Sequence, residues 1–257
     1  MATALVTGGT SGIGAAFARA LAARGDDLVL VGRNADRLYE TAAELQTRFG
    51  VAVEVMVADL GQRADAVTVG ERLSDLERPV DMLVNNAGFG VHTAITAADT
   101  SPHEYAFDVM CRAVLILSAA AGRAMRDRGT GAIITVSSTA GFVTMGTYSA
   151  IKAWATVFTE GLAVELAGSG VTVTALCPGW VRTEFHQRAN IETAKIPGPL
   201  WLDADRLVAD CLRDVARGRV ISLPSRRYRA LMFVARHAPR RTIRAVSSQL
   251  SSSRHSR

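Results

Sequence analysis

Cysteine and proline are both scarce in this sequence. The three cysteines, Cys111, Cys177 and Cys211, are far apart and form no Cys-x-x-Cys pair, so we expect no disulfide framework and no metal site. Unpaired thiols indicate a reducing compartment, the cytoplasm. With 7 prolines and 22 glycines in 257 residues the chain is not of low complexity, and its 49% of hydrophobic residues exclude a disordered protein.

Targeting and membrane segments are also missing from the sequence. The N-terminus has no basic region followed by an apolar one, so we expect no signal peptide. No run of about 20 predominantly apolar residues free of charges stands out, so we predict that no segment spans a membrane.

Acidic residues are absent from residues 224–257, which hold nine arginines. Because the whole chain has a net charge of +5, the other 223 residues carry −4, and the basic character belongs to this C-terminal extension. Nucleic-acid binding needs a basic folded face with stacking aromatics, so a single terminal block does not favour it. The extension is open to four interpretations: a solvated tail, or a contact with a membrane, with a partner or, least favoured, with a nucleic acid.

Part of the extension has helical spacing. Tyr228, Leu231, Met232 and Ala235 recur at that spacing, arginines surround them, and Pro239 ends the pattern. This is typical of an amphipathic helix that lies on anionic lipid or packs on a neighbouring subunit, and a frayed tail remains the alternative.

Residues 1–223 alternate short apolar runs with longer helical patterns. Strands buried on both faces of a parallel sheet read as such apolar runs, so we predict one doubly wound α/β domain. The expected strands are 4–7, 28–31, 52–57, 82–85, 132–136, 171–176 and 219–222, and the expected helices are about 12–24, 35–49, 64–77, 102–128, 148–168 and 203–217. Residues 178–202 contain three prolines and no strand pattern, which predicts a loop-rich substrate flap.

A glycine-rich loop follows the first expected strand. Glycines there let a pyrophosphate approach the backbone at a helix N-terminus, whose free N–H groups favour an anion. A plain strand-to-helix turn is the alternative. The residues expected to hold the cofactor phosphates are Gly8, Thr10, Ser11, Gly12, Ile13 and Gly14.

The second expected strand ends in Gly32 and Arg33. An NAD site usually has an acid at this strand end to bind the ribose hydroxyls, whereas a 2′-phosphate needs a cation there. Gly32 supplies no carboxylate and Arg33 offers a planar donor fork, so the sequence predicts NADP(H) over NAD(H). A surface arginine at the start of a helix is the alternative.

A serine pair and a Tyr-x-x-x-Lys pair follow later in the chain. Tyr148 and Lys152 are four residues apart and share a helix face. A phenol has a pKa near 10, so a fixed cation beside it favours the phenolate and makes it useful in acid–base chemistry. A serine hydroxyl from a neighbouring strand end then holds a substrate carbonyl beside the phenol.

Five motifs in order, TGGTSGIG, NNAG, SS, YSAIK and CPG, closely resemble the classical short-chain dehydrogenase/reductase family over residues 3–222. The resemblance implies a Rossmann fold with a parallel seven-stranded sheet flanked by helices, and hydride transfer between a nicotinamide and a carbonyl or alcohol. It makes Tyr148 the acid/base, Lys152 the residue that lowers its pKa and binds the nicotinamide ribose, and Ser138 the carbonyl orienter. Ser138 fits better than Ser137, because the family serine is the second of its pair.

The same resemblance assigns further cofactor contacts. Asp59, with Leu60 beside it, is expected at the adenine. The residues expected along the cofactor are Asn85, Asn86, Ala87 and Gly88, and those expected at the nicotinamide carboxamide are Pro178, Gly179 and Thr183.

Two features depart from the family pattern. Met110 stands where the family commonly has a catalytic asparagine, and a thioether does not replace an amide in a proton relay. The loop from Ser138 to Tyr148 is also about three residues shorter than usual. We predict an active enzyme, because Ser138, Tyr148 and Lys152 remain. The alternative is a non-catalytic NADP(H)-binding sensor or assembly protein.

Aromatic and apolar residues of the loops predict a lipophilic carbonyl or alcohol substrate. They are Phe89, Phe142, Met145, Trp180, Phe185, Trp201 and Leu202, and packing of the flap itself is the alternative role for them. The resemblance also implies a homodimer or homotetramer formed through the helices near 102–128 and 148–168.

Overall fold

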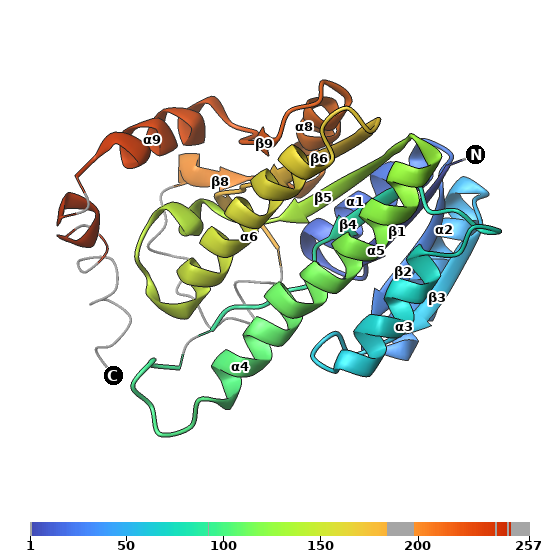
Figure 1. The fold of residues 1–257 in the computed structure, drawn as a ribbon, viewed down its shortest axis with the longest axis horizontal. Helices are drawn as coiled ribbons and strands as arrows, with labels where there is room; N and C mark the ends of the chain where they lie inside the picture. The colour runs from blue at the N-terminus through green and yellow to red at the C-terminus, as the bar shows by residue number, and fades with distance from the viewer. Residues whose placement is uncertain (1, 92, 184–197, 240, 246, 248–257) are drawn as a thin grey trace.

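The protein is built around a parallel sheet of seven strands in the order β3-β2-β1-β4-β5-β6-β9 (Figure 1). The computed structural model describes residues 2–91, 93–183, 198–239, 241–245 and 247. The strands of this sheet are β1 (Thr3–Thr7), β2 (Asp27–Gly32), β3 (Val53–Val57), β4 (Met82–Asn85), β5 (Gly131–Val136), β6 (Val171–Leu176) and β9 (Ile221–Ser222). All seven expected strands and the doubly wound parallel sheet are therefore confirmed.

Helices cover both faces of the sheet because its strands are apolar on both sides. On one face α1 (Gly12–Ala23), α2 (Ala35–Phe49) and α8 (Ala204–Ala216) bury residues such as Phe17 and Cys211 against the strands. On the other face lie α3 (Arg63–Leu73), α4 (Ser101–Phe107), α5 (Ala113–Arg128) and α6 (Gly146–Glu165). This arrangement brings the carboxyl ends of β1 to β6 to one edge, where ligands bind in such sheets.

The helix predicted near 102–128 runs over Ser101–Arg128 and contains a π-helical turn, η1 (Asp108–Arg112), between α4 and α5. By length and composition it is apolar enough to cross a membrane, although it contains Asp108 and Arg112, and the absence of a membrane span stays a prediction. Much of the helix is covered by protein, because 61% of its most apolar stretch is buried against the rest of the fold. Burial in a core layer explains the same composition.

The flap contains more regular structure than its sequence indicates. Strand β7 (Trp180–Val181) pairs in parallel with β8 (Trp201–Leu202), so the predicted loop-rich flap also holds two short strands that its sequence did not indicate. The 3-10 turn η4 (Gly198–Leu200) precedes β8. Each strand has only two residues, which is too short to show an alternating pattern. Of the flap positions named above, Phe185 lies outside the described residues.

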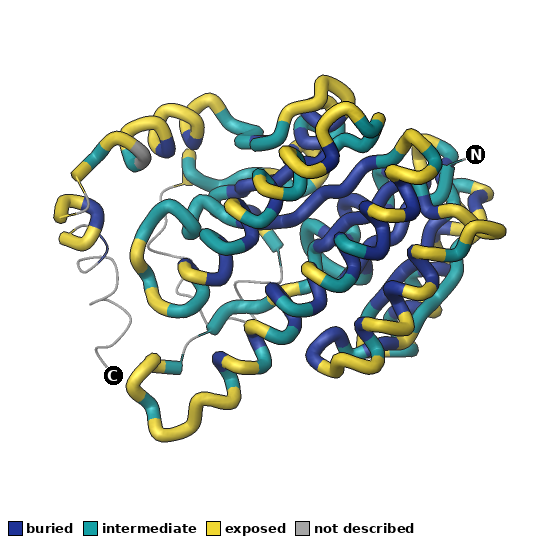
Figure 2. Tube along the Cα trace, viewed as in Figure 1, coloured by how far each residue is buried: buried dark blue, intermediate teal, exposed yellow. Residues whose placement is uncertain are grey.

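The basic extension begins with a helix, α9 (Arg226–His237), that lies beside β8 (Figure 1). Tyr228 and Met232 are buried against the domain, whereas Leu231, Phe233 and Val234 are 51%, 66% and 63% exposed (Figure 2). The helix therefore has an inner face that packs on its own domain and an outer face on which apolar side chains are exposed beside arginines. A domain boundary at residue 223 stays a prediction.

Candidate active site

Residues from two strand ends lock the glycine loop in place. The Asn86 side chain donates to the carbonyl oxygens of Thr7 at 2.9 Å and Gly8 at 3.2 Å, and the Thr7 hydroxyl accepts from the backbone N–H groups of Asn86 and Ala87. A Cβ added to Gly14 would lie 2.2 Å from the Gly8 oxygen, so only glycine fits where α1 starts. The loop is therefore held open to an anion by contacts that admit no side chain.

The flap strand end meets this loop. A Cβ added to Gly12 would lie 3.3 Å from the Thr183 side chain, which places Thr183 over the N-terminus of α1. The predicted phosphate-loop residues Thr10, Ser11 and Ile13 are partly exposed beside it. Sequence positions about 170 residues apart are thus brought together as the motif assignment requires.

Three side chains form a cluster at the ends of β2 and β3. Arg33 donates from Nη1 to the Tyr105 hydroxyl at 2.7 Å, and this hydroxyl donates to Asp59 Oδ1, also at 2.7 Å. Burial raises the pKa of Tyr105, and its hydrogen bond to Asp59 adds to that rise. Arg33 remains exposed, while Leu60 next to Asp59 is buried. An exposed guanidinium held at the end of β2 is suited to bind a phosphate.

The two serines after β5 have different surroundings. The Ser137 hydroxyl is buried and donates to the Lys152 carbonyl oxygen at 2.7 Å, with Thr156 Oγ1 at the same distance. Ser138 is partly exposed, and its Oγ accepts from the Ala140 N–H at 3.0 Å. Ser137 thus serves the backbone of α6, and Ser138 is the serine that faces the site.

Tyr148 and Lys152 project from the first turns of α6 next to Ser138. Burial raises the pKa of Tyr148 to about 12, and a hydrogen bond from Ser138 opposes this shift. The Lys152 ammonium lies 5.6 Å from the centre of the Tyr148 ring and donates to the Val136 carbonyl oxygen at 2.8 Å. Burial lowers the pKa of Lys152 to about 8. Burial of the phenol dominates the shift of Tyr148 and the Lys152 ammonium is engaged with a carbonyl, so the effect of Lys152 on the pKa of Tyr148 stays a prediction.

The region behind Lys152 is lined by apolar and sulfur-containing side chains. Met110 is buried in the π-helical turn, and a Cβ added to Gly88 would lie 3.0 Å from its Sδ. The Cys111 thiol is also buried there, which raises its pKa to about 11. Asn85 points away from the cofactor edge, since its Nδ2 donates to Ser118 Oγ at 2.9 Å. Met110 thus fills the position where an asparagine was expected.

The Pro178-Gly179-Trp180 segment is covered by the C-terminal helix. A Cβ added to Gly179 would lie 1.9 Å from the Tyr228 ring, so the ring packs directly on this glycine. The Tyr228 hydroxyl accepts from the Trp180 N–H at 3.0 Å and donates to the Leu200 carbonyl oxygen at 2.8 Å. One side chain of α9 therefore joins the segments that lead into both flap strands.

The opposite wall of the site is also held by the C-terminal region. The Thr139 N–H, in the turn η2 (Thr139–Phe142) that follows Ser138, donates to the Pro178 carbonyl oxygen at 2.9 Å. Further along, the Thr144 N–H donates to Ser247 Oγ at 3.1 Å, and Ser247 is buried. The C-terminal region thus contacts the flap and the shortened loop, the two segments expected to enclose a substrate.

The flap tryptophans pack on one another. The ring centres of Trp180 and Trp201 are 6.3 Å apart, and the Arg182 guanidinium lies 5.8 Å from the Trp201 ring centre. Phe89 stacks on Tyr105 at 5.5 Å. At least some of the aromatic residues assigned to the substrate therefore stabilise the loops themselves.

Comparison with known proteins agrees with this geometry. The family model for short chain dehydrogenases matches residues 2–194. The chain belongs to the short-chain dehydrogenase family. This places it among oxidoreductases, and the residues after 194, which include α8 and α9, lie outside the match.

Three similar proteins illustrate the relationship. An uncharacterised oxidoreductase of Staphylococcus saprophyticus is 38% identical over 183 residues, which are 70% of this chain and 78% of that protein. A short-chain dehydrogenase from Sphingobium yanoikuyae in complex with NADPH has a TM-score of 0.83 at 35% identity and covers 92% of this chain and 94% of its own. The bulky-bulky ketone specific alcohol dehydrogenase from Comamonas testosteroni has a TM-score of 0.79 at 29% identity, with 94% and 98% covered.

Sequence reasoning did not anticipate two site residues, Tyr105 and Tyr228. Tyr105 links Arg33 to Asp59, and Tyr228 covers Gly179. Both were visible only as members of helical patterns. The helical spacing around Tyr228 predicted that it lies on the apolar face of a helix. It did not indicate that this face would pack on Gly179.

Proposed function

We propose that the protein is an NADP(H)-dependent oxidoreductase that interconverts a carbonyl compound and a secondary alcohol. The observation that carries this proposal is the convergence of Ser138, Tyr148 and Lys152 beside a glycine loop that admits no side chain. A dinucleotide fits the residues present, since the cradle at Gly14 is open to a phosphate, the exposed Arg33 after β2 to a ribose phosphate, and the partly exposed Asp59 after β3 to a base. When bound, NADPH supplies the hydride that reduces the carbonyl carbon.

The preference for NADP(H) rests on the end of β2. Gly32 offers no carboxylate to ribose hydroxyls, and Arg33 is exposed and already oriented by Tyr105 at 2.7 Å. A guanidinium in this position favours a 2′-phosphate. The NADPH bound to the Sphingobium relative supports this preference.

The protonation states suit reduction of a carbonyl. Because burial raises the pKa of Tyr148 to about 12, its phenol is protonated at neutral pH and gives its proton to the developing alkoxide oxygen. Ser138 donates a hydrogen bond to the same oxygen and orients it. Lys152, with a pKa lowered to about 8, is mostly charged at pH 7 and binds the nicotinamide ribose.

The substrate is proposed to be lipophilic. The flap presents Trp180 and Trp201 on paired strands, and loop residues Phe142 and Met145 are partly exposed on the opposite side. The name of the Comamonas relative, which is specific for bulky-bulky ketones, supports a bulky carbonyl compound.

Oxidation of NADPH in the presence of a panel of steroids, acyl ketones and small aldehydes tests the function. We expect turnover with at least one bulky ketone, and a loss of about 1000-fold in Tyr148→Phe, which keeps the ring but removes the acidic proton. NADPH affinity should change little. Full activity in Tyr148→Phe would contradict the role of the phenol.

A non-catalytic NADP(H)-binding protein is the second candidate, because Met110 occupies the position expected for asparagine. It predicts tight NADPH binding without turnover of any ketone by the wild type. The same panel therefore separates the two candidates.

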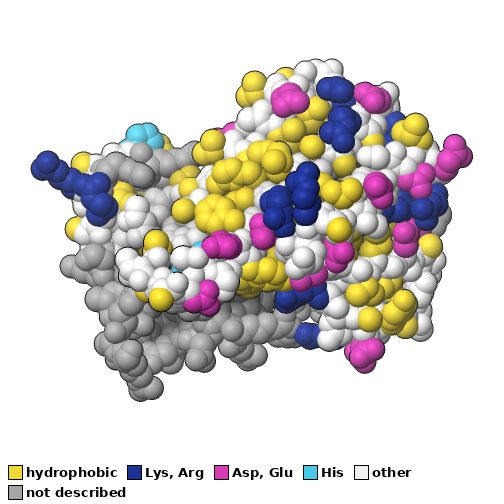
Figure 3. Space-filling model, turned by 60° about the horizontal axis from the view of Figure 1, so that its bottom comes forward, with side chains coloured by type: hydrophobic (Ala, Val, Ile, Leu, Met, Phe, Trp, Pro, Cys, Tyr) yellow, Lys and Arg dark blue, Asp and Glu magenta, His cyan; other side chains and the backbone are white. Residues whose placement is uncertain are grey.

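Association and location are further parts of the proposal. Figure 3 shows hydrophobic side chains gathered on one face of the molecule. On α5 and α6, Leu115, Val157 and Val164 are 49%, 68% and 77% exposed, which supports a homodimer or homotetramer formed through these helices. We place the protein in the cytoplasm, with the outer apolar face of α9 in peripheral contact with a membrane, and co-sedimentation with anionic vesicles tests that contact.

A further inference from the structure

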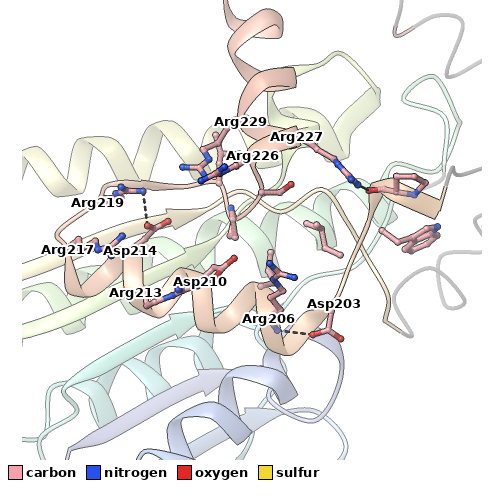
Figure 4. A pocket seen from close by; sticks show the side chains of 17 residues that line it. Asp203, Arg206, Asp210, Arg213, Asp214, Arg217, Arg219, Arg226, Arg227 and Arg229 are labelled. Carbon is pink, nitrogen blue, oxygen red and sulfur yellow. Dashed lines mark hydrogen bonds and ion pairs between the residues drawn. The ribbon is translucent and has the colours of Figure 1, made fainter.

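A basic groove of about 820 Å³ lies between α8 and α9, at the β9 edge of the sheet (Figure 4). Seven arginines and three aspartates line it, an excess of four positive charges. Figure 4 shows arginines of α8 on one side and arginines of α9 on the other. The groove lies outside the cofactor site, and neither the motifs nor the proposed reaction account for it.

All three aspartates of the groove are already engaged. Asp210 pairs with Arg213 one helical turn away, and Asp214 accepts from Arg219 at 3.0 Å and from a buried serine hydroxyl. Asp203 caps the N-terminus of α8, where it accepts a backbone N–H at 2.9 Å. These carboxylates therefore do not neutralise the other arginines.

Four arginines keep their guanidinium groups without a hydrogen bond or ion pair to any described residue. Arg206 and Arg217 come from α8 and its C-terminus, and Arg226 and Arg229 come from the first turn of α9. All four are exposed. Like charges that face one another across a groove repel, and an anion between them removes that cost. Guanidinium forks bind phosphate oxygens in pairs, and two phosphate groups would match the charge excess.

The other end of the groove is apolar and reaches the flap. Pro199, Trp201 and Leu202 line it there, and Arg227 donates to the Pro199 carbonyl oxygen at 2.8 Å. Trp201 belongs to β8, which pairs with β7 directly after Gly179. A ligand held by the arginines therefore has its organic part directed towards the proposed substrate site.

We propose that the α8–α9 groove binds the phosphate groups of an organic ligand, and that this ligand is the phosphate-bearing tail of the carbonyl substrate. The second clause rests on the proposed function, whereas phosphate binding does not. The substrate class is thus a ketone attached to a carrier with two or more phosphates.

Titration of the full-length protein with coenzyme A, in the presence of saturating NADP⁺ to fill the dinucleotide site, tests the groove. Pantetheine, which lacks the phosphates, is the matched probe. We expect coenzyme A to bind and pantetheine not to bind. In Arg226→Ala/Arg229→Ala we expect binding to weaken by about 100-fold, because each lost charged contact costs about tenfold.

The matched control variant is Arg48→Ala, an exposed arginine on α2 at the other edge of the sheet. It should bind coenzyme A as the wild type does. The double variant should melt at the wild-type temperature, since its removed guanidinium groups hold no described partner, whereas the Arg48 guanidinium lies 5.0 Å from the Phe49 ring centre. If coenzyme A does not bind, or if wild type and double variant bind it equally, the proposal that the groove binds phosphate groups is contradicted. Binding of phosphatidylglycerol vesicles that the double variant loses, and that coenzyme A does not compete, would assign these arginines to lipid and contradict the proposed phosphate site as well.

Kinetics with two thioesters of the same ketone test the substrate class. Acetoacetyl-coenzyme A should show a KM at least about tenfold below that of acetoacetyl-N-acetylcysteamine, and the double variant should abolish the difference without changing kcat or the KM for NADPH. If coenzyme A binds but neither thioester is reduced, or both thioesters have the same KM, phosphate binding by the groove is supported. The proposal that the substrate carries the phosphates is then contradicted. If no carbonyl of any kind is reduced while coenzyme A still binds, the proposed function fails instead.

Discussion

The region up to residue 183 and the basic extension from residue 224 onward are held in place in different ways. In the first, backbone segments approach so closely that no side chain fits between them, as at Gly14 and the Gly8 oxygen. In the second, a few side chains, chiefly Tyr228 and Ser247, attach a helix and a short segment to the walls of the site. The first region carries the family motifs and the proposed chemistry, whereas the second contacts the segments expected to enclose a substrate. We therefore propose that backbone fit determines cofactor binding, and that side chains of the extension influence which substrate is bound.

We expect the largest effect from Gly14→Ala, which tests the close backbone fit of the first region. The new Cβ would lie 2.2 Å from the Gly8 oxygen and 2.4 Å from Asn86 Nδ2, and both atoms are fixed by hydrogen bonds. We expect a loss of about 3 kcal/mol in the free energy of unfolding and no detectable NADPH binding. Urea denaturation and fluorescence titration measure both.

The control for this substitution is Gly161→Ala. A Cβ there meets nothing within 4 Å, and the residue lies inside α6. Alanine should therefore stabilise the protein by up to about 1 kcal/mol and leave NADPH binding unchanged. Equal effects of the two substitutions would contradict the close fit.

The fold was predictable because its signals are local. Strands buried on both faces read as continuous apolar runs, and the glycine loop directly follows the first of them. Ser138 was separable from Ser137 only by the family pattern, although the structure gives a physical reason, since Ser137 is occupied by the Lys152 carbonyl.

The rest depends on contacts between distant positions. Tyr105 reaches Asp59 across 46 positions and Tyr228 reaches Trp180 across 48, and no periodicity records such pairs. The strands β7 and β8 are too short to have a pattern, and the charge excess of residues 224–257 did not reveal that α9 faces further arginines on α8.

Tyr228→Phe tests how the second region is attached by the Tyr228 hydroxyl. The ring stays on Gly179, but the Trp180 N–H and the Leu200 carbonyl lose their shared partner. We expect a loss of about 2 kcal/mol in stability and a rise of about fivefold in the KM for the carbonyl substrate, with the KM for NADPH unchanged.

Tyr39→Phe is the matched control for Tyr228→Phe, since Tyr39 is 61% exposed on α2. It should leave stability and both KM values at their wild-type values. A rise in the KM for NADPH in Tyr228→Phe would show that the C-terminal region also shapes the cofactor site.

The smallest effect is expected from pH. Because burial lowers the pKa of Lys152 to about 8, its ammonium is lost as the pH rises through this value, while Tyr148, with a pKa of about 12, stays protonated. We expect kcat/KM to fall above about pH 8, and Lys152→Arg to move this limb beyond pH 10 because guanidinium stays charged.

The free energy of unfolding changes with pH in the opposite direction to kcat/KM. The buried ammonium costs stability below about pH 8, and this cost is relieved as the pH rises from 8 towards the unfolded value near 10. Urea denaturation between pH 7 and 9 measures this gain in stability.

For activity, a pH–rate profile that stays flat to pH 10 in the wild type would contradict the charged role of Lys152.

We propose that residues 2–183 form a site that binds NADP(H) more tightly than NAD(H). Fluorescence titration of wild type and Arg33→Ala with NADPH and with NADH tests it most directly. We expect the wild type to bind NADPH more tightly than NADH. Arg33→Ala should weaken NADPH binding by about 30-fold and leave NADH binding nearly unchanged, because only the 2′-phosphate loses a charged partner. An unchanged preference for NADPH in Arg33→Ala, or an equal loss for both cofactors, would contradict it.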